Sequence, residues 1–155
     1  MKYSYVYVFF LVFLFVSCEN HGYLSLTNGY EHDVVVHTPY DHNGDTFGQT
    51  DVFFSGYRYY MSGNRREYEH IIAVRIETLD GTVLAEYTPE YFLYLRKIYG
   101  IKKKQVERWI LTEKGLFLET REISNRYVQD IRKIIEYYRS DEAVQDLQAM
   151  LEAVE

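Results

Sequence analysis

Alternating hydrophobic and polar residues predict a series of strands in the first half of the chain. Turn-forming residues separate these segments, because Pro and the pairs Asn-Gly and Asp-Gly favour chain reversal. The expected strands are residues 23–27, 33–38, 51–61, 69–79 and 82–87. The last two flank Asp80 and Gly81 and form the clearest hairpin signal in the sequence.

The segment between the second and third expected strands has the composition of a loop, at residues 41–50. Pro39 is expected to end the strand that precedes it. Residues 51–61 are rich in aromatic side chains, which favour strands, and Gly56 is expected to form a bend or bulge within them.

The hydrophobic spacing changes from alternation to a helical period at Thr88. Thr88 suits a helix N-cap, Pro89 suits the first turn, and Gly100 suits the position after the last turn. The apolar stripe of this predicted helix consists of Tyr91, Phe92, Leu95, Ile98 and Tyr99.

The last third of the chain is expected to form two strands and then two helices. The strands, at residues 106–111 and 116–123, flank a turn, and a helix follows from Ser124 or Asn125 to about Arg139. Ser140 is expected to cap the final helix. Residues 23–155 therefore predict a single α+β domain. Its core is strand-rich and β-sandwich-like, with one internal helix and two C-terminal helices.

The first 17 residues have the pattern of a secretory signal peptide. Lys2 gives a basic start, an apolar stretch runs to Val16, and the small residue Ser17 precedes Cys18. A transmembrane helix is the alternative, but it needs about 20 apolar residues, and this stretch is shorter.

A short motif at the end of this stretch resembles the lipobox of bacterial lipoproteins: Leu14, Phe15, Val16, Ser17 and Cys18. Phe15 stands in place of the usual Leu. This relaxed pattern is most similar to that of spirochaetes. The resemblance implies cleavage after Ser17, a diacylglyceryl group on Cys18, and further acylation, for example by palmitate. Residues 18–22 would then be a lipidated tether to the membrane. An ordinary secretory peptide, in which Cys18 carries no lipid, remains the alternative.

Composition narrows the classes of partner. The net charge of −6 is unfavourable for binding a phosphate backbone, so nucleic acid is not expected as a partner. The chain has one cysteine, so no disulfide is expected within it. The run Lys102 to Lys104 suits either a solvated loop, which we favour, or contact with anionic headgroups.

The His-rich stretch between residues 32 and 45 is a weak candidate for metal binding. Four residues of types that bind metals lie close together in the sequence, namely His37, Asp41, His42 and Asp45. Their spacing does not match that of a calcium-binding loop. A solvated polar loop is the simpler interpretation. No catalytic residue or cofactor is assigned, because the sequence has no nucleophile elbow, phosphate loop or dinucleotide fingerprint.

The aromatic segment is the stronger candidate for binding a partner. Its candidate residues are Tyr57, Arg58, Tyr59 and Tyr60. One face of a strand here must be core, and the other would expose aromatics, with Arg58 expected to lie exposed among them. The alternative is that helices cover both faces and the whole segment is core.

Three functions are therefore open. The leading one is a lipid-anchored, non-catalytic binding or accessory domain in the cell envelope, on the inner or outer membrane and facing the periplasm or the surface. The second is an envelope hydrolase or metal-dependent enzyme that uses the His37–Asp45 region. The third is a structural or assembly component that binds another envelope protein.

Overall fold

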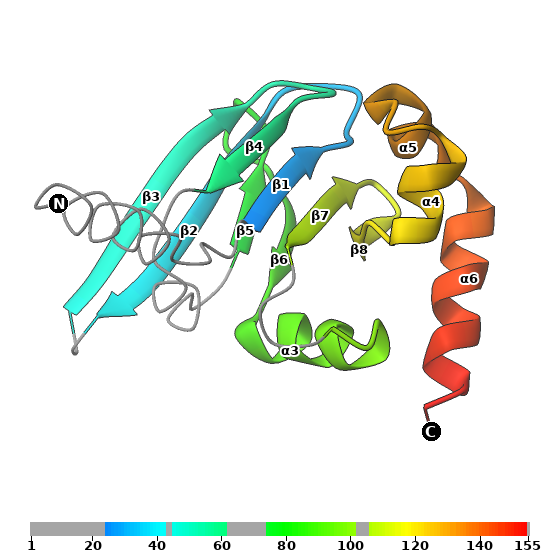
Figure 1. The fold of residues 1–155 in the computed structure, drawn as a ribbon. Helices are drawn as coiled ribbons and strands as arrows, with labels where there is room; N and C mark the ends of the chain where they lie inside the picture. Colours follow the sequence, from blue (N-terminus) through cyan, green and yellow to red (C-terminus); the bar gives the residue numbers. More distant parts are fainter. Residues whose placement is uncertain (1–23, 43–44, 62–73, 102–105, 155) are drawn as a thin grey trace, which may run out of the picture.

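The computed structural model describes residues 24–42, 45–61, 74–101 and 106–154 of the 155-residue chain. In these residues the strands form two four-stranded sheets (Figure 1). The order in the first sheet is β4-β1-β7-β8, and in the second it is β3-β2-β5-β6. The strands of the first sheet are β1 (Leu24–Asn28), β4 (Arg58–Met61), β7 (Glu107–Thr112) and β8 (Gly115–Leu118). Those of the second are β2 (Val34–His42), β3 (Asp45–Phe53), β5 (Val74–Glu77) and β6 (Val83–Tyr87).

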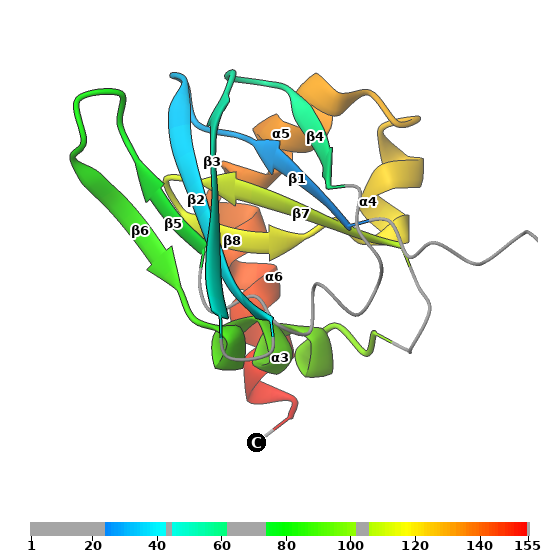
Figure 2. The same cartoon turned by 90° about the vertical axis from the view of Figure 1, so that its left-hand side faces the viewer.

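The first sheet has one parallel pair at its centre. β1 runs parallel to β7, and the pairing starts with Leu24 beside Glu107, so both strands begin at the same edge of the sheet. The other described pairs in both sheets are antiparallel. In Figure 2 the strands of one sheet run across those of the other.

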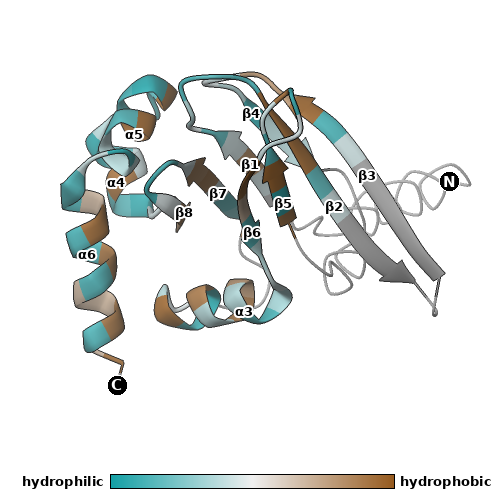
Figure 3. Ribbon diagram, turned by 180° about the vertical axis from the view of Figure 1, so that it is seen from behind, coloured by the Kyte–Doolittle hydropathy of each residue, from teal (hydrophilic) through white to brown (hydrophobic). Residues whose placement is uncertain are grey.

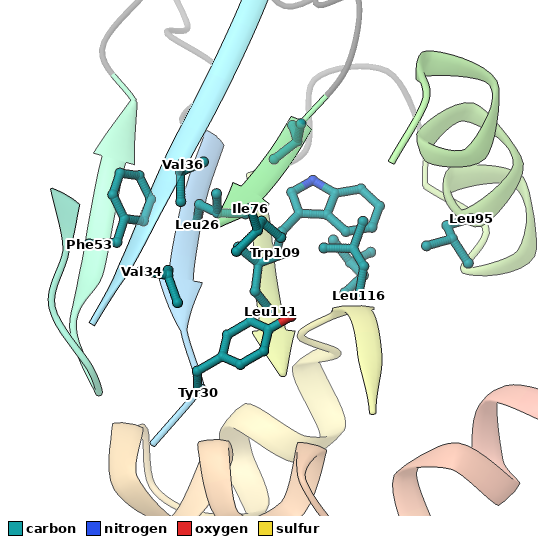
Figure 4. Close-up of a cluster of buried hydrophobic side chains, with 12 residues drawn as sticks. Leu26, Tyr30, Val34, Val36, Phe53, Ile76, Leu95, Trp109, Leu111 and Leu116 are labelled. Atoms are coloured by element: carbon teal, nitrogen blue, oxygen red, sulfur yellow. The ribbon is translucent and has the colours of Figure 1, made fainter. Parts of the chain in front are cut away.

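The main core lies between the two sheets. Inward positions alternate along each strand, so Val34, Val36 and Ile76 of the second sheet meet Leu26 and Trp109 of the first (Figure 4). Helix α3 (Pro89–Ile98) closes one end of this core, because its Leu95 is 1% exposed and belongs to the same cluster.

The other face of the first sheet packs against three short helices. These are α4 (Arg121–Arg126), α5 (Ile131–Tyr138) and α6 (Asp141–Glu152). Ile110 and Phe117 point to this side and are buried against Ile134 and Tyr138. The arrangement is therefore sheet on sheet, with helices outside one sheet, which confirms the predicted α+β fold with a strand-rich core.

The structure corrects two strand boundaries. β2 continues through Pro39 to His42 and pairs with the nine-residue β3, where we expected Pro39 to end a strand and residues 41–50 to form a loop. In the described residues β5 pairs with β2 only from Val35 to His37. Pro39 lies opposite Gly48 of β3 within this pairing, two residues past the last described partner of β5.

The predicted helix from residue 124 to 139 is two helices. Val128 and Gln129 between them have left-handed φ values of 51° and 60°. Thr120 and Asp130 cap α4 and α5, in place of the expected Ser124 or Asn125, and Val128 in the break between them is 86% exposed. The caps at Thr88 and Ser140 are confirmed. None of the helices in the described residues has the length and apolar character needed to cross a membrane.

Candidate functional site

The aromatic segment connects the two sheets and is not one strand. β3 ends at Phe53 in the second sheet, and β4 begins at Arg58 in the first. Residues 54–57 make the crossing. Gly56 has a φ of 77°, which confirms the bend predicted there.

The buried side chain of Asn28 fastens this crossing to the core. Its Nδ2 donates to the carbonyl oxygens of Phe53 (2.8 Å) and His32 (3.1 Å), and its Oδ1 accepts from the backbone N–H of Tyr30 (2.9 Å). Asn28 is 0% exposed. One side chain therefore links the end of β1, the loop after it and the end of β3.

Four more hydrogen bonds fix the backbone of the crossing. Gly56 N–H donates to the Asn28 carbonyl (2.9 Å), and Asn28 N–H donates to the Tyr57 carbonyl (3.0 Å). Ser55 N–H donates to Asp33 Oδ1 (2.9 Å), and the Ser55 hydroxyl donates to the Tyr30 carbonyl (2.6 Å). The conformation is therefore determined by the protein and does not depend on a partner.

Two aromatic side chains project from this fixed backbone. Phe54 is 55% exposed and Tyr57 is 65% exposed. Their rings meet edge to face, with centroids 6.4 Å apart. We call Phe54 and Tyr57 the aromatic turn. It presents apolar area to solvent without the need to order a flexible loop.

The neighbouring tyrosines of β4 lie on opposite faces of the first sheet. Tyr59 is opposite Leu26 of β1 and packs inward, where its ring stacks on Phe53 with centroids 4.0 Å apart. Tyr60 points to the other face and is 67% exposed. Of the four predicted partner-binding residues, Tyr57 and Tyr60 are thus open to solvent, and Tyr59 is largely core.

Arg58 is not the exposed residue that we expected. Its side chain is 16% exposed and forms an ion pair with Glu119, whose side chain is 1% exposed. Arg58 Nε also donates to the Thr27 hydroxyl (3.1 Å), and Arg108 Nη1 lies 3.4 Å from the other Glu119 oxygen. We call Arg58, Arg108 and Glu119 the arginine–glutamate bridge.

This bridge spans the outer face of the first sheet. Arg58 starts on the edge strand β4, and Glu119 follows β8 at the opposite edge. The register places Ser25 of β1 between Tyr60 and Arg108, on the same face. Ser25 is 0% exposed, and its hydroxyl has no hydrogen-bond partner in the described part of the chain. The bridge thus joins the two edges of the sheet over a small polar patch.

The His-rich stretch is only partly described. The ring of His37 is hydrogen-bonded to Thr50 Oγ1 (2.9 Å) and to Glu77 Oε2 (3.1 Å) across neighbouring strands. The side chains of Asp41, His42 and Asp45 lie outside the described residues. Among those that are described, no three potential ligands gather at one point.

The other predicted sites lie outside the described residues. These are Cys18 with its signal peptide, and the run Lys102 to Lys104. Both remain predictions from the sequence.

Comparisons with protein-family models, with curated proteins and with solved structures find no match to this chain.

Sequence reasoning missed the residues that hold the site together. Asn28 and Gly29 form an Asn-Gly pair, which predicts a turn, and Gly29 N–H instead donates to the Leu111 carbonyl of the neighbouring β7 at 2.7 Å. A Cβ on Gly29 would meet that same oxygen at 2.7 Å. The tight approach of Gly29 explains the glycine, but nothing in the local pattern indicated that Asn28 would bond to a strand 25 residues away.

Proposed function

We propose that this chain is a lipid-anchored protein of the bacterial envelope whose domain binds a protein partner and has no catalytic activity of its own. The observation that carries the binding role is the aromatic turn. Phe54 and Tyr57 are exposed, in contact with each other, and held by a backbone with fixed hydrogen bonds.

The fixed backbone preorganises the aromatic turn for binding. Binding ordinarily costs about 0.5–1.5 kcal/mol for each flexible side chain that becomes ordered, and a fixed turn reduces that cost. Aromatic residues are enriched among those that dominate binding energy at protein interfaces. A pair of exposed rings on a fixed backbone is therefore a suitable anchor for a partner.

The anchoring role rests on the N-terminal sequence. Cys18 is the one cysteine of the chain and follows an apolar segment with a lipobox-like ending. Two or three acyl chains hold a protein stably on a membrane, since each buried CH₂ contributes about 0.8 kcal/mol.

Truncating the aromatic turn tests the binding role. We expect the double variant Phe54→Ala, Tyr57→Ala to capture at least about tenfold less envelope partner than the wild type, as hot-spot truncation by 1.4 kcal/mol or more would produce. Both side chains are more than half exposed, so the melting temperature should change little. The measurement is a quantitative pull-down from envelope extracts, with thermal unfolding of the same preparations.

Leu79→Ala provides the matched control. Leu79 is 65% exposed, like Tyr57, but lies in the turn between β5 and β6. Capture by this control should equal that of the wild type. Equal capture by the double variant would rule out the aromatic turn as the binding surface. A separate Tyr60→Ala variant shows whether the outer face of the first sheet takes part.

A further inference from the structure

Helix α3 is hydrophobic on two sides. Its inner side packs into the core, where Leu95 and Ile98 are buried and Phe92 meets Trp109 with centroids 5.1 Å apart. Hydrophobic positions recur along the whole helix in Figure 3. A helix that closes one end of a core needs only one such side.

The second side faces solvent. Four exposed residues follow the spacing of one helical face, and they are Glu90, Leu93, Tyr94 and Lys97. Leu93 is 61% exposed and Tyr94 is 42% exposed. We call these four residues the outer face of α3.

The last turn of α3 lies next to the start of the described chain. Arg96 forms an ion pair with Glu107 at 2.8 Å, and Glu107 is the register partner of Leu24. Adjacent strands are about 4.8 Å apart. Because β1 and β7 are parallel, both start at the end of the sheet beside α3, and the chain enters the domain there (Figure 1).

The distance from there to Cys18 is short. Six residue steps separate Cys18 from Leu24, and a fully extended chain of that length spans at most about 22 Å. A lipid on Cys18 would therefore hold this corner of the domain close to the bilayer surface.

We propose that the outer face of α3 rests on the bilayer interface as a second membrane contact. This inference depends on the lipid at Cys18 proposed above. Leu93 and Tyr94 enter the boundary between headgroups and acyl chains, where Tyr places its ring in apolar surroundings and its hydroxyl near water. Lys97, one turn further on, reaches the phosphate groups.

This contact would orient the whole domain. The aromatic turn lies beyond the opposite end of β1, since β4 begins opposite Thr27 and pairs back towards Leu24. A domain that rests on α3 near the start of β1 therefore presents Phe54 and Tyr57 away from the membrane, where a partner can reach them.

Fluorescent labelling of the full chain in vesicles tests the proposal. Cys18 is the one cysteine, so a cysteine introduced as Leu93→Cys is the single free thiol when Cys18 carries lipid. The purified lipoprotein is labelled there with an environment-sensitive fluorophore and reconstituted into phosphatidylcholine–phosphatidylglycerol vesicles, with and without lipids that carry a quencher. We expect a blue-shifted emission and loss of fluorescence in the vesicles with quencher.

Leu79→Cys is the matched control, because Leu79 is as exposed as Leu93 and lies in the β5–β6 turn, at the end of β6 away from α3 (Figure 2). Its label should keep the emission that it has in water. Equal behaviour of the two labels on vesicle-bound protein overturns the contact by α3 and leaves the lipid anchor standing. A blue-shifted Leu93 label that lipid quenchers do not affect also overturns it, since a second copy of the chain would then cover the helix. A wild-type chain that reacts with the thiol reagent instead overturns the lipid anchor.

Discussion

At the residue scale, the arginine–glutamate bridge decides how the first sheet responds to mutation. A carboxylate as buried as Glu119 needs its positive partners, because an uncompensated buried charge is strongly destabilising. We expect Arg58→Ala to lower the free energy of unfolding by about 3 kcal/mol, at the low end of the cost of breaking a buried pair, since Arg108 remains. Denaturant unfolding measures this cost.

The companion variants separate the pair from its charge. Arg58→Met combined with Glu119→Leu should recover much of the lost stability, because no charge is then left buried without a partner. Lys114→Ala removes an exposed pair with Asp141 and should cost less than about 1 kcal/mol. If Arg58→Ala were as mild as Lys114→Ala, the bridge would not contribute to stability.

The sequence did not reveal this pair, for a physical reason. Arg58 and Glu119 are 61 residues apart, and a local alternation pattern carries no information about which distant strands become neighbours. Tyr57 and Tyr60 are two of the four candidates from the sequence, but one strand would place them on opposite faces. Both are exposed because Tyr57 belongs to the crossing between the sheets and only Tyr60 belongs to β4. Arg58 is largely buried because it has an ion-pair partner. The order of strands in the sheet brings that partner near, and the local sequence pattern does not show it.

At the element scale, the crossing between the sheets depends on the amide of Asn28. We expect Asn28→Asp, which keeps the shape but removes both N–H donors, to destabilise the domain by about 2–4 kcal/mol. Two backbone carbonyls would lose their donor, and a buried charge would replace a neutral group. Partner capture should also weaken, although Phe54 and Tyr57 are unchanged.

Hydrogen exchange of the Ser55 and Gly56 amides, combined with the pull-down, measures this effect. Both amides are hydrogen-bonded in the folded protein and should exchange faster in the variant. Unchanged exchange and capture would show that the turn holds its shape without Asn28.

Elements set by local chemistry were predictable, and those set by distant pairing were not. The hairpin at Asp80 and Gly81 and the caps at Thr88 and Ser140 follow from residues a few positions apart. The sequence does not indicate the break at Val128 and Gln129, because neither residue type favours the left-handed conformation that both adopt.

At the scale of the whole molecule, buried tyrosines make the domain sensitive to alkali. Burial raises the pKa of Tyr138 to about 12, and it also raises the pKa values of Tyr87 and Tyr99. The neutral form is therefore favoured in the folded state. This contribution is complete below the unfolded pKa of about 10 and is lost as the pH rises through about 12, so stability should fall across that range.

Unfolding free energies measured from pH 8 to 12 test this expectation. In Tyr138→Phe the decline above pH 10 should be shallower. At neutral pH the same variant should lose about 1–3 kcal/mol, because the Tyr138 hydroxyl donates to the Leu118 carbonyl (3.1 Å) and accepts from Thr120 N–H (3.0 Å). Tyr57→Phe, at an exposed position, is the control. A pH profile identical for both variants would contradict the role of Tyr138.

The parallel pairing of β1 with β7 also has a consequence for the order in which the chain folds. The two strands are separated by roughly 80 residues, and such distant contacts form slowly because a long loop must close first. Synthesis runs from the N-terminus, so β1 is made first and must wait for β7 before the centre of the first sheet can form. This topology therefore makes the centre of the first sheet a late product of folding.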